Sequence, residues 1–226
     1  MNNYSTNVDR EKPVICLIFA SIVIAFLFNE HVYPIAESIW YSLFSKEGDF
    51  NTLLGFLDIS LAALTSMGVY KILWYLYDEH FWKFKKFGCK LINKMPDLSG
   101  EWRGTCSSSY KQKKGEETQL QMKMIINQSY SKIKAVCSFY KDDLDENTST
   151  SRSVLIGVFE EGNDAVLRFS FQNNSNEVST KSKLYLGYNE FSVNLKEMTM
   201  EGQYFNGRDS GQNHGVMKLK KMTEES

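Results

Sequence analysis

The segment QLQMKMIIN, Gln119 to Asn127, decides the fold class, because apolar and polar residues alternate along it. In an extended strand, successive side chains point to opposite faces. The apolar side chains that would share one face are Leu120, Met122, Met124 and Ile126. The segment Asp164 to Gln172 repeats the alternation and puts Arg168 on the polar face. The pattern predicts strands that bury one face and expose the other to water.

From Pro96 onward, short segments of this kind follow one another without a helical pattern between them. The candidate strands are Leu98 to Ser107, Gln119 to Asn127, Lys132 to Tyr140, Ser151 to Glu160, Asp164 to Gln172, Lys181 to Tyr188, Phe191 to Glu197, Met198 to Asn206 and His214 to Lys221. Polar turn sequences such as Asp142 to Thr150 and Asn173 to Asn176 separate them. Because some neighbours merge, we expect about eight strands in an antiparallel meander. We therefore predict an all-β, closed small barrel whose interior holds side chains or one small ligand.

The first predicted strand of this barrel contains a short motif, Gly100-x-Trp102. It is similar to the glycine-x-tryptophan signature that opens lipocalin-like barrels, so we expect a lipocalin-like architecture. We expect Trp102 to close the floor of the barrel rather than to contact a ligand.

Two apolar segments precede the barrel. Val14 to Phe28 contains no charged residue, and Leu53 to Tyr77 is interrupted only by Asp58 and Lys71. A helix needs about 20 apolar residues to cross a bilayer, and the first segment extends past this length with its apolar flanks, Pro13 and Val32 to Leu43. The two segments therefore predict two transmembrane helices. A secretory signal peptide is the alternative for the first segment, but no small-x-small cleavage site follows it.

Lysines and aromatic residues alternate after the second apolar segment, in DEHFWKFKKFGCKLINK, Asp78 to Lys94. Positive charge next to a span marks the cytoplasmic side, so we expect the N-terminus and the barrel to be cytoplasmic. The segment is typical of an interfacial helix on anionic lipid, and nucleic-acid binding is the less favoured alternative. The chain therefore divides into a membrane anchor, residues 1–95, and a barrel domain, residues 96–226.

Composition argues against several classes of function. The formal net charge is −1, which does not indicate a nucleic-acid partner. The four cysteines lack metal-like spacing, which indicates reduced thiols in the cytoplasm. His31, His80 and His214 are scattered, and the sequence has no phosphate-binding loop or nucleophile elbow. We therefore expect no enzyme activity, no cofactor and no metal.

The whole arrangement resembles a known family. The chain combines two spans, a lysine-rich aromatic exit, the sequence PDLSGEW (Pro96 to Trp102) at the start of the barrel and GQYFN (Gly202 to Asn206) late in it. It looks like the two-transmembrane, β-strand-rich effectors of CBASS, the bacterial anti-phage systems that use cyclic oligonucleotide signals. The resemblance implies that a partner cyclase makes a cyclic dinucleotide, which the barrel binds. Effectors of this family then oligomerise and disrupt the inner membrane, which kills the infected cell.

A cyclic dinucleotide offers two phosphates and two bases, so its site should contain cations and aromatic rings. The residues that we expect to bind it are Arg152, Arg168, Tyr185 and Tyr204. For membrane assembly we single out Asp58, because a carboxylate within a span is costly and usually faces a partner, although it could instead reach the interface. The alternatives to this function are a membrane-anchored barrel for a lipid or another apolar ligand, and a non-toxic scaffold.

Overall fold

The computed structural model describes most of the chain, in two compact units. The described residues are 1–32, 34–35, 38–39, 42, 66–84, 95–111, 117–141, 147–175, 185–207 and 213–222. One unit joins Met1–Val8 to Lys94–Ser226, and the other is Asp9–Asn93. The first eight residues of the chain therefore belong to the barrel unit, which the sequence pattern did not predict.

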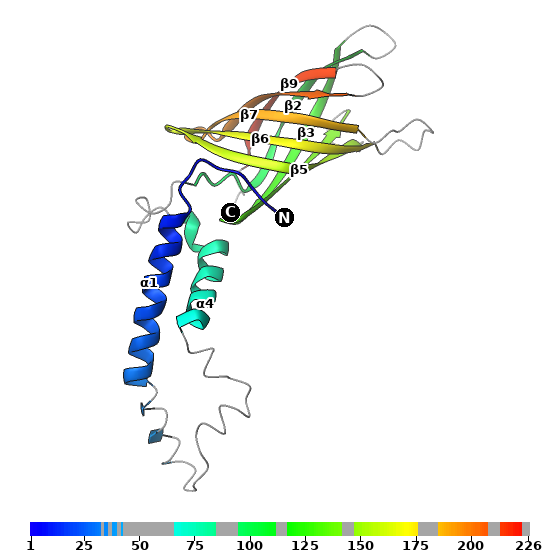
Figure 1. Ribbon diagram of the computed structural model, residues 1–226. Helices are drawn as coiled ribbons and strands as arrows, with labels where there is room; N and C mark the ends of the chain where they lie inside the picture. The colour runs from blue at the N-terminus through cyan, green and yellow to red at the C-terminus, as the bar shows by residue number, and fades with distance from the viewer. Residues whose placement is uncertain are drawn as a thin grey trace. The chain divides into compact units, whose positions relative to one another are not determined.

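The barrel unit is a closed, antiparallel barrel of eight strands (Figure 1). The strands are β2 (Gly100–Lys111), β3 (Glu117–Gln128), β4 (Lys132–Tyr140), β5 (Asn147–Glu161), β6 (Asp164–Ser175), β7 (Tyr185–Asn194), β8 (Thr199–Asn206) and β9 (Asn213–Lys221). Their order is β4-β3-β2-β9-β8-β7-β6-β5, and pairing of β4 with β5 closes the barrel. The predicted all-β barrel of about eight strands is confirmed.

Most predicted strands are present, with two informative differences. The described parts of the candidates Lys181 to Tyr188 and Phe191 to Glu197 form one strand, β7, which ends at Asn194, and residues 181–184 lie outside the described residues. They merge because Asn189 is buried and Glu190 lies on the outer face, so the alternation continues through the expected turn. Strand β5 begins at Asn147 rather than Ser151, and its added residues pair with β4 and β6.

Trp102 closes one end of the barrel, as expected for its motif. Its side chain is completely buried, and its indole N–H donates a hydrogen bond to the backbone oxygen of Leu98 (3.0 Å).

Two residues after Trp102, Gly104 lets β2 and β9 approach closely. A Cβ atom at Gly104 would lie 1.8 Å from the backbone oxygen of Lys218, so no other residue fits there.

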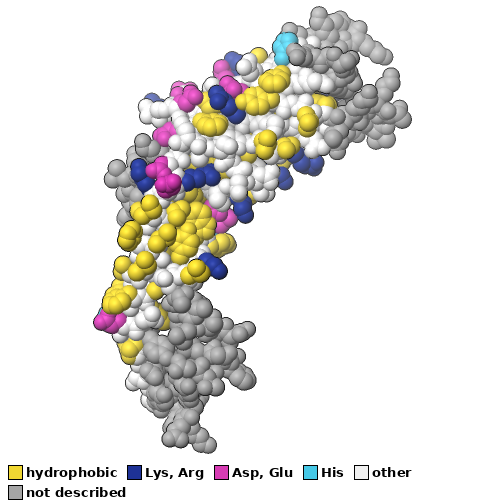
Figure 2. Space-filling model, in the orientation of Figure 1, with side chains coloured by type: hydrophobic (Ala, Val, Ile, Leu, Met, Phe, Trp, Pro, Cys, Tyr) yellow, Lys and Arg dark blue, Asp and Glu magenta, His cyan; other side chains and the backbone are white. Residues whose placement is uncertain are grey.

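The second unit contains the two apolar segments of the sequence. Its described helices are α1 (Glu11–Leu27), which continues as a π-helical turn, η1 (Phe28–Val32), and α4 (Ser66–Glu79), which is followed by a 3-10 turn, η3 (Phe81–Lys83). Helices α1 and α4 pack against each other. On the face that Figure 2 shows, apolar side chains cover most of the described part of this unit, whereas apolar and charged side chains mix on the barrel.

Among the described residues, one helix is long and apolar enough to cross a membrane, Glu11–His31. Two spans were predicted, so the structure supports that prediction only in part. Most of the second predicted span, including Asp58, lies outside the described residues, and α4 is its C-terminal part. Phe19 and Phe26 on α1 are more than half exposed, as expected for side chains that face lipid.

Two leucines of the barrel test the division into an inner and an outer face. Leu167 is completely buried, and Leu155 is 74 % exposed. We expect Leu167→Ala to lower the free energy of unfolding by about 2–5 kcal/mol, because it leaves a cavity in the core. The matched variant Leu155→Ala should change it by less than about 0.5 kcal/mol. Urea denaturation of the detergent-solubilised protein measures both, and equal losses would contradict the assignment of faces.

Candidate functional site

The two ends of the barrel interior differ in chemistry. At the end closed by Trp102, the interior contains apolar side chains such as Ile126, Met200 and Leu219. At the other end, where the connections between strands lie outside the described residues, polar side chains point inward. We call this the polar end of the barrel; its inward residues are Ser108, Ser151, Asn173, Tyr185, Asn189, Tyr204 and Asn206. Buried polar groups are costly unless they are hydrogen-bonded, so such a cluster indicates a site or a structural network.

Three neighbouring strands build the first part of the polar end. The register places Ser151 of β5 beside Asn173 of β6, and Asn173 beside Tyr185 of β7. The Ser151 hydroxyl donates to the Asn173 Oδ1 (2.7 Å), and the Asn173 Nδ2 donates to the Tyr185 hydroxyl (2.5 Å). Ser151 and Asn173 are almost completely buried.

Tyr204 of β8 forms the second part. Its hydroxyl donates to the Ser108 Oγ of β2 (2.6 Å). A Cβ atom on Gly215 would lie 2.4 Å from the Tyr204 ring, so glycine is required for the ring to lie across β9. Asn189, the register neighbour of Tyr204 on β7, is 2 % exposed. Burial raises the pKa of Tyr204 to about 12, so the phenol stays neutral at physiological pH.

Two of the four predicted ligand residues therefore meet in the interior, and two do not. Tyr185 and Tyr204 point inward at the polar end. Arg168 lies on the outer face between buried neighbours, pairs with Glu190 (Nε to Oε2, 3.1 Å), and has its guanidinium 5.5 Å from the centre of the Phe159 ring. Arg152 is also exposed on the outer face. The alternation of their strands decides this placement, since both arginines are out of phase with the buried side chains.

The sequence interpretation missed the asparagines and serines of the polar end. Asn173 was assigned to a turn, although it continues the inward series Phe169 and Phe171. Asn206 belongs to the quoted GQYFN segment but was not among the residues expected to bind the ligand. Extending the Asp164 to Gln172 strand by one residue would have found Asn173, and the phase of Tyr204 in its own strand already puts Asn206 on the inner face.

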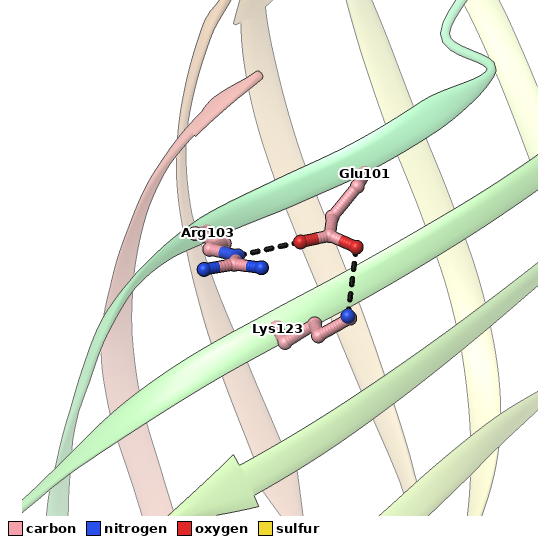
Figure 3. A network of polar contacts seen from close by, with 3 residues as sticks. All are labelled: Glu101, Arg103 and Lys123. Atoms are coloured by element: carbon pink, nitrogen blue, oxygen red, sulfur yellow. Dashed lines mark hydrogen bonds and ion pairs between the residues drawn. The ribbon is translucent and has the colours of Figure 1, made fainter. Parts of the chain in front are cut away.

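A carboxylate on the outer face between β2 and β3 bonds two cations. Glu101 accepts a hydrogen bond from the Arg103 Nε (2.5 Å) and one from the Lys123 Nζ (2.7 Å) (Figure 3). The bond from Lys123 is the main cause that lowers the pKa of Glu101. Because all three side chains satisfy one another on the surface, this cluster ties β2 to β3 and does not resemble a binding site.

The His, Cys, Asp and Glu side chains were also compared with metal-binding and nucleophilic arrangements in the part of the chain that the structure describes. It contains no group of three His, Cys, Asp or Glu side chains that could hold a metal ion. Cys106 and Cys137 are free but buried, and burial raises the pKa of both thiols, that of Cys106 to about 12. Thiols of this kind are poor nucleophiles.

A closed barrel with a polar, tyrosine-containing end to its interior is typical of a receptor for a small molecule. The comparisons with known proteins define that class further. Residues 93–221, more than half of the chain, match the family model of the Cap15 cyclic dinucleotide receptor domain. The chain belongs to this family of CBASS effectors, which is a receptor family and not a catalytic one. No curated protein matches the chain.

The raised pKa of Tyr204 predicts a pH dependence. The folded protein holds the phenol proton more tightly than the unfolded chain, whose tyrosines ionise near pH 10. Stability from this group is therefore complete below about pH 10 and is lost as the pH rises towards 12. We expect the free energy of unfolding to fall less steeply between pH 10 and 12 in Tyr204→Phe than in the wild type. Identical slopes in alkaline urea titrations would show that Tyr204 is not buried as described.

Proposed function

We propose that the protein is a membrane effector of the CBASS type, whose barrel binds a cyclic dinucleotide at its polar end. The ligand comes from a partner cyclase that responds to phage infection. Binding triggers homo-oligomerisation, and the oligomer disrupts the bacterial inner membrane and kills the cell. The family match supports the class of ligand, and the apolar helix α1 supports the membrane location.

The observation that carries the choice of site is the set of inward asparagines and tyrosines at the polar end. Asparagine amides both donate and accept hydrogen bonds, as the polar edges of nucleobases require. Tyrosine rings provide faces on which bases stack, at about 1–3 kcal/mol per base. Asn173 and Tyr185 lie on one side of the polar end, and Asn189 and Tyr204 on neighbouring strands, so each ring has an amide beside it.

The phosphates of the ligand need a separate source of positive charge. None of the described residues that line the polar end is Lys or Arg. The sequences that connect the strands at this end contain cationic residues, namely Lys113, Lys114, Lys181, Lys183 and Arg208. We therefore expect the phosphates to be bound at the mouth of the barrel and the bases to point inward.

For the membrane part we propose two spans, with the N-terminus and the barrel on the cytoplasmic side and Asp58 facing a neighbouring copy in the bilayer. The lysine-rich segment after the second apolar stretch supports this orientation. The boundary between anchor and barrel would lie near residue 95.

A lipid ligand is the less favoured alternative. A lipid chain would need a continuous apolar channel, but the apolar half of the interior is filled by side chains such as Trp102, Phe169 and Phe191, all at most 1 % exposed. The remaining half is polar, which suits a ligand with hydrogen-bonding edges.

Calorimetric titration of the full-length protein in nanodiscs with 3′,3′-cyclic di-AMP, cyclic di-GMP and cyclic GMP-AMP tests the site. We expect one of them to bind, and we expect Tyr185→Ala and Tyr204→Ala each to weaken it by at least about tenfold, through loss of stacking. The outer-face variant Arg168→Ala serves as the control and should change the affinity by less than about threefold. Loss of binding in Arg168→Ala with full binding in the tyrosine variants would move the site to the outer face.

The role of Asp58 is separable from ligand binding. Replacement by leucine removes a carboxylate whose insertion costs about 2.5–3.5 kcal/mol and which we propose is compensated by a partner in the oligomer. We expect Asp58→Leu to bind the ligand normally but to assemble and permeabilise vesicles less. Liposome dye release and cross-linking measure this, and release equal to that of the wild type would refute the role.

A further inference from the structure

Seven of the eight junctions between barrel strands extend along most of the strands, but the junction that closes the barrel does not. Strands β4 and β5 pair only between Val136–Tyr140 and Asn147–Arg152. Beyond Val136 and Arg152 the two strands diverge: the Ala135 N–H donates to the Ser153 Oγ (3.0 Å) rather than to a backbone oxygen, and a bulge in β5 follows at Ser153–Leu155. We call the diverging parts, residues 132–135 of β4 and 153–160 of β5, the seam. Backbone groups along a seam of this kind need other partners, because unpaired strand edges are costly when buried and adhesive when exposed.

The first residues of the chain supply those partners. Strand β1 (Asn2–Asn3) pairs antiparallel with Ile133 and Lys132 of β4. Ser5 then forms a parallel bridge with β5: its N–H donates to the oxygen of Ile156 (3.1 Å), and its oxygen accepts from the N–H of Val158 (2.9 Å). The segment Met1–Val8 thus crosses from one side of the seam to the other, and Figure 1 shows it (dark blue) passing beside the barrel.

Side chains extend this pairing at both ends of the segment. The Asn7 Nδ2 donates to the oxygen of Glu160 and its Oδ1 accepts from the N–H of Glu160, both at 2.8 Å, so the amide replaces a backbone partner. The Asn2 Nδ2 donates to the oxygen of Val154 (3.2 Å). In these contacts the asparagine side-chain amides take the place of the backbone N–H and C=O groups that a longer strand would supply.

Tyr4, between these contacts, anchors the segment in the core. It is 5 % exposed, and its hydroxyl donates to the oxygen of Tyr130 (3.0 Å) and accepts from the Gln128 Nε2 (3.3 Å). Gln128 also donates to the oxygen of Pro96 (3.0 Å) and accepts from the N–H of Leu98 (2.9 Å). The segment before helix α1 and the segment that enters β2 therefore meet at one glutamine of β3.

We propose that the seam is a strand-binding surface whose occupant is the N-terminus of this same chain, and that docking of Met1–Val8 and ligand binding stabilise each other. The family match begins at residue 93 and does not include this segment. The receptor is then a nine-stranded unit. Helix α1, which begins at Glu11, follows directly after the segment that completes the barrel.

The route from the seam to the polar end is short. The last β4–β5 pair before the seam is Val136–Arg152, and the next is Cys137–Ser151. Ser151 begins the hydrogen-bonded chain through Asn173 to Tyr185. If the Val136–Arg152 pair also opens, Ser151 and the side chains bonded to it lie at the edge of the seam. A ligand that holds these hydrogen-bonded side chains in place opposes opening of the β4–β5 pairs. By reciprocity, a docked N-terminal segment raises the affinity for the ligand. This link to the ligand rests on the proposed function.

Ser5 offers a matched pair of variants, because its contacts with β5 are made by its backbone. Ser5→Pro removes the N–H that bonds to Ile156, and Ser5→Ala keeps it. Hydrogen exchange of the full-length protein in nanodiscs reports on the amides of Val158 and Glu160, which bond to the N-terminal segment. We expect their exchange to be at least about tenfold faster in Ser5→Pro and unchanged in Ser5→Ala. Unchanged exchange in both variants would overturn the proposal.

Titration with the same three cyclic dinucleotides tests the link. We expect Ser5→Pro to bind about five- to tenfold more weakly than Ser5→Ala, and the ligand to slow exchange of Val158 and Glu160 in the wild type. Faster exchange in Ser5→Pro with unchanged affinity would overturn the link to ligand binding, while the docking of the N-terminal segment in the seam would stand. If the wild type binds none of the three, the proposed function fails, while the exchange measurement still decides whether the N-terminus occupies the seam.

Discussion

An open antiparallel sheet has two edges whose N–H and C=O groups need partners, and in this protein β4 and β5 must provide them for each other. The rest of the barrel depends on this closure. Only a closed ladder gives every strand an inner and an outer face, and only then do the alternating residues of eight strands form one interior. The pairing is short, and the first residues of the chain complete it. Because so few residue pairs close this small barrel, ligand binding and folding can be coupled at the β4–β5 junction.

The interior that closure creates is divided by chemistry. Apolar side chains fill the end closed by Trp102, so stability comes mainly from that half. The other half contains asparagines, serines and tyrosines bonded in short chains. These bonds satisfy the buried polar groups, and we propose that a ligand with donors and acceptors along its edge replaces them. Stability and the proposed recognition site then lie in different halves of one barrel.

Much of the fold follows from local alternation, as the match of β4 with its predicted bounds shows. Alternation within a strand needs no knowledge of its partners, so it survives in the sequence alone. The proposed binding site was harder to predict, because it depends on which face of its strand each residue occupies and on which residues of distant strands pair. Arg168 was chosen for its charge although its own strand puts it on the outer face, and Asn173 was given to a turn. The N-terminal segment was missed because its residues are polar and its partners are about 130–155 positions away in sequence.

The central claim is that the ligand binds inside the barrel at its polar end. The most direct measurement is a crystal structure of the protein with the bound cyclic dinucleotide. We expect electron density for the bases inside the barrel, against β7 and β8 and in contact with Tyr185 and Tyr204, with the phosphates towards the mouth. Density on the outer face near Arg152 or Arg168, with the interior tyrosines and asparagines bonded as they are without ligand, would contradict it.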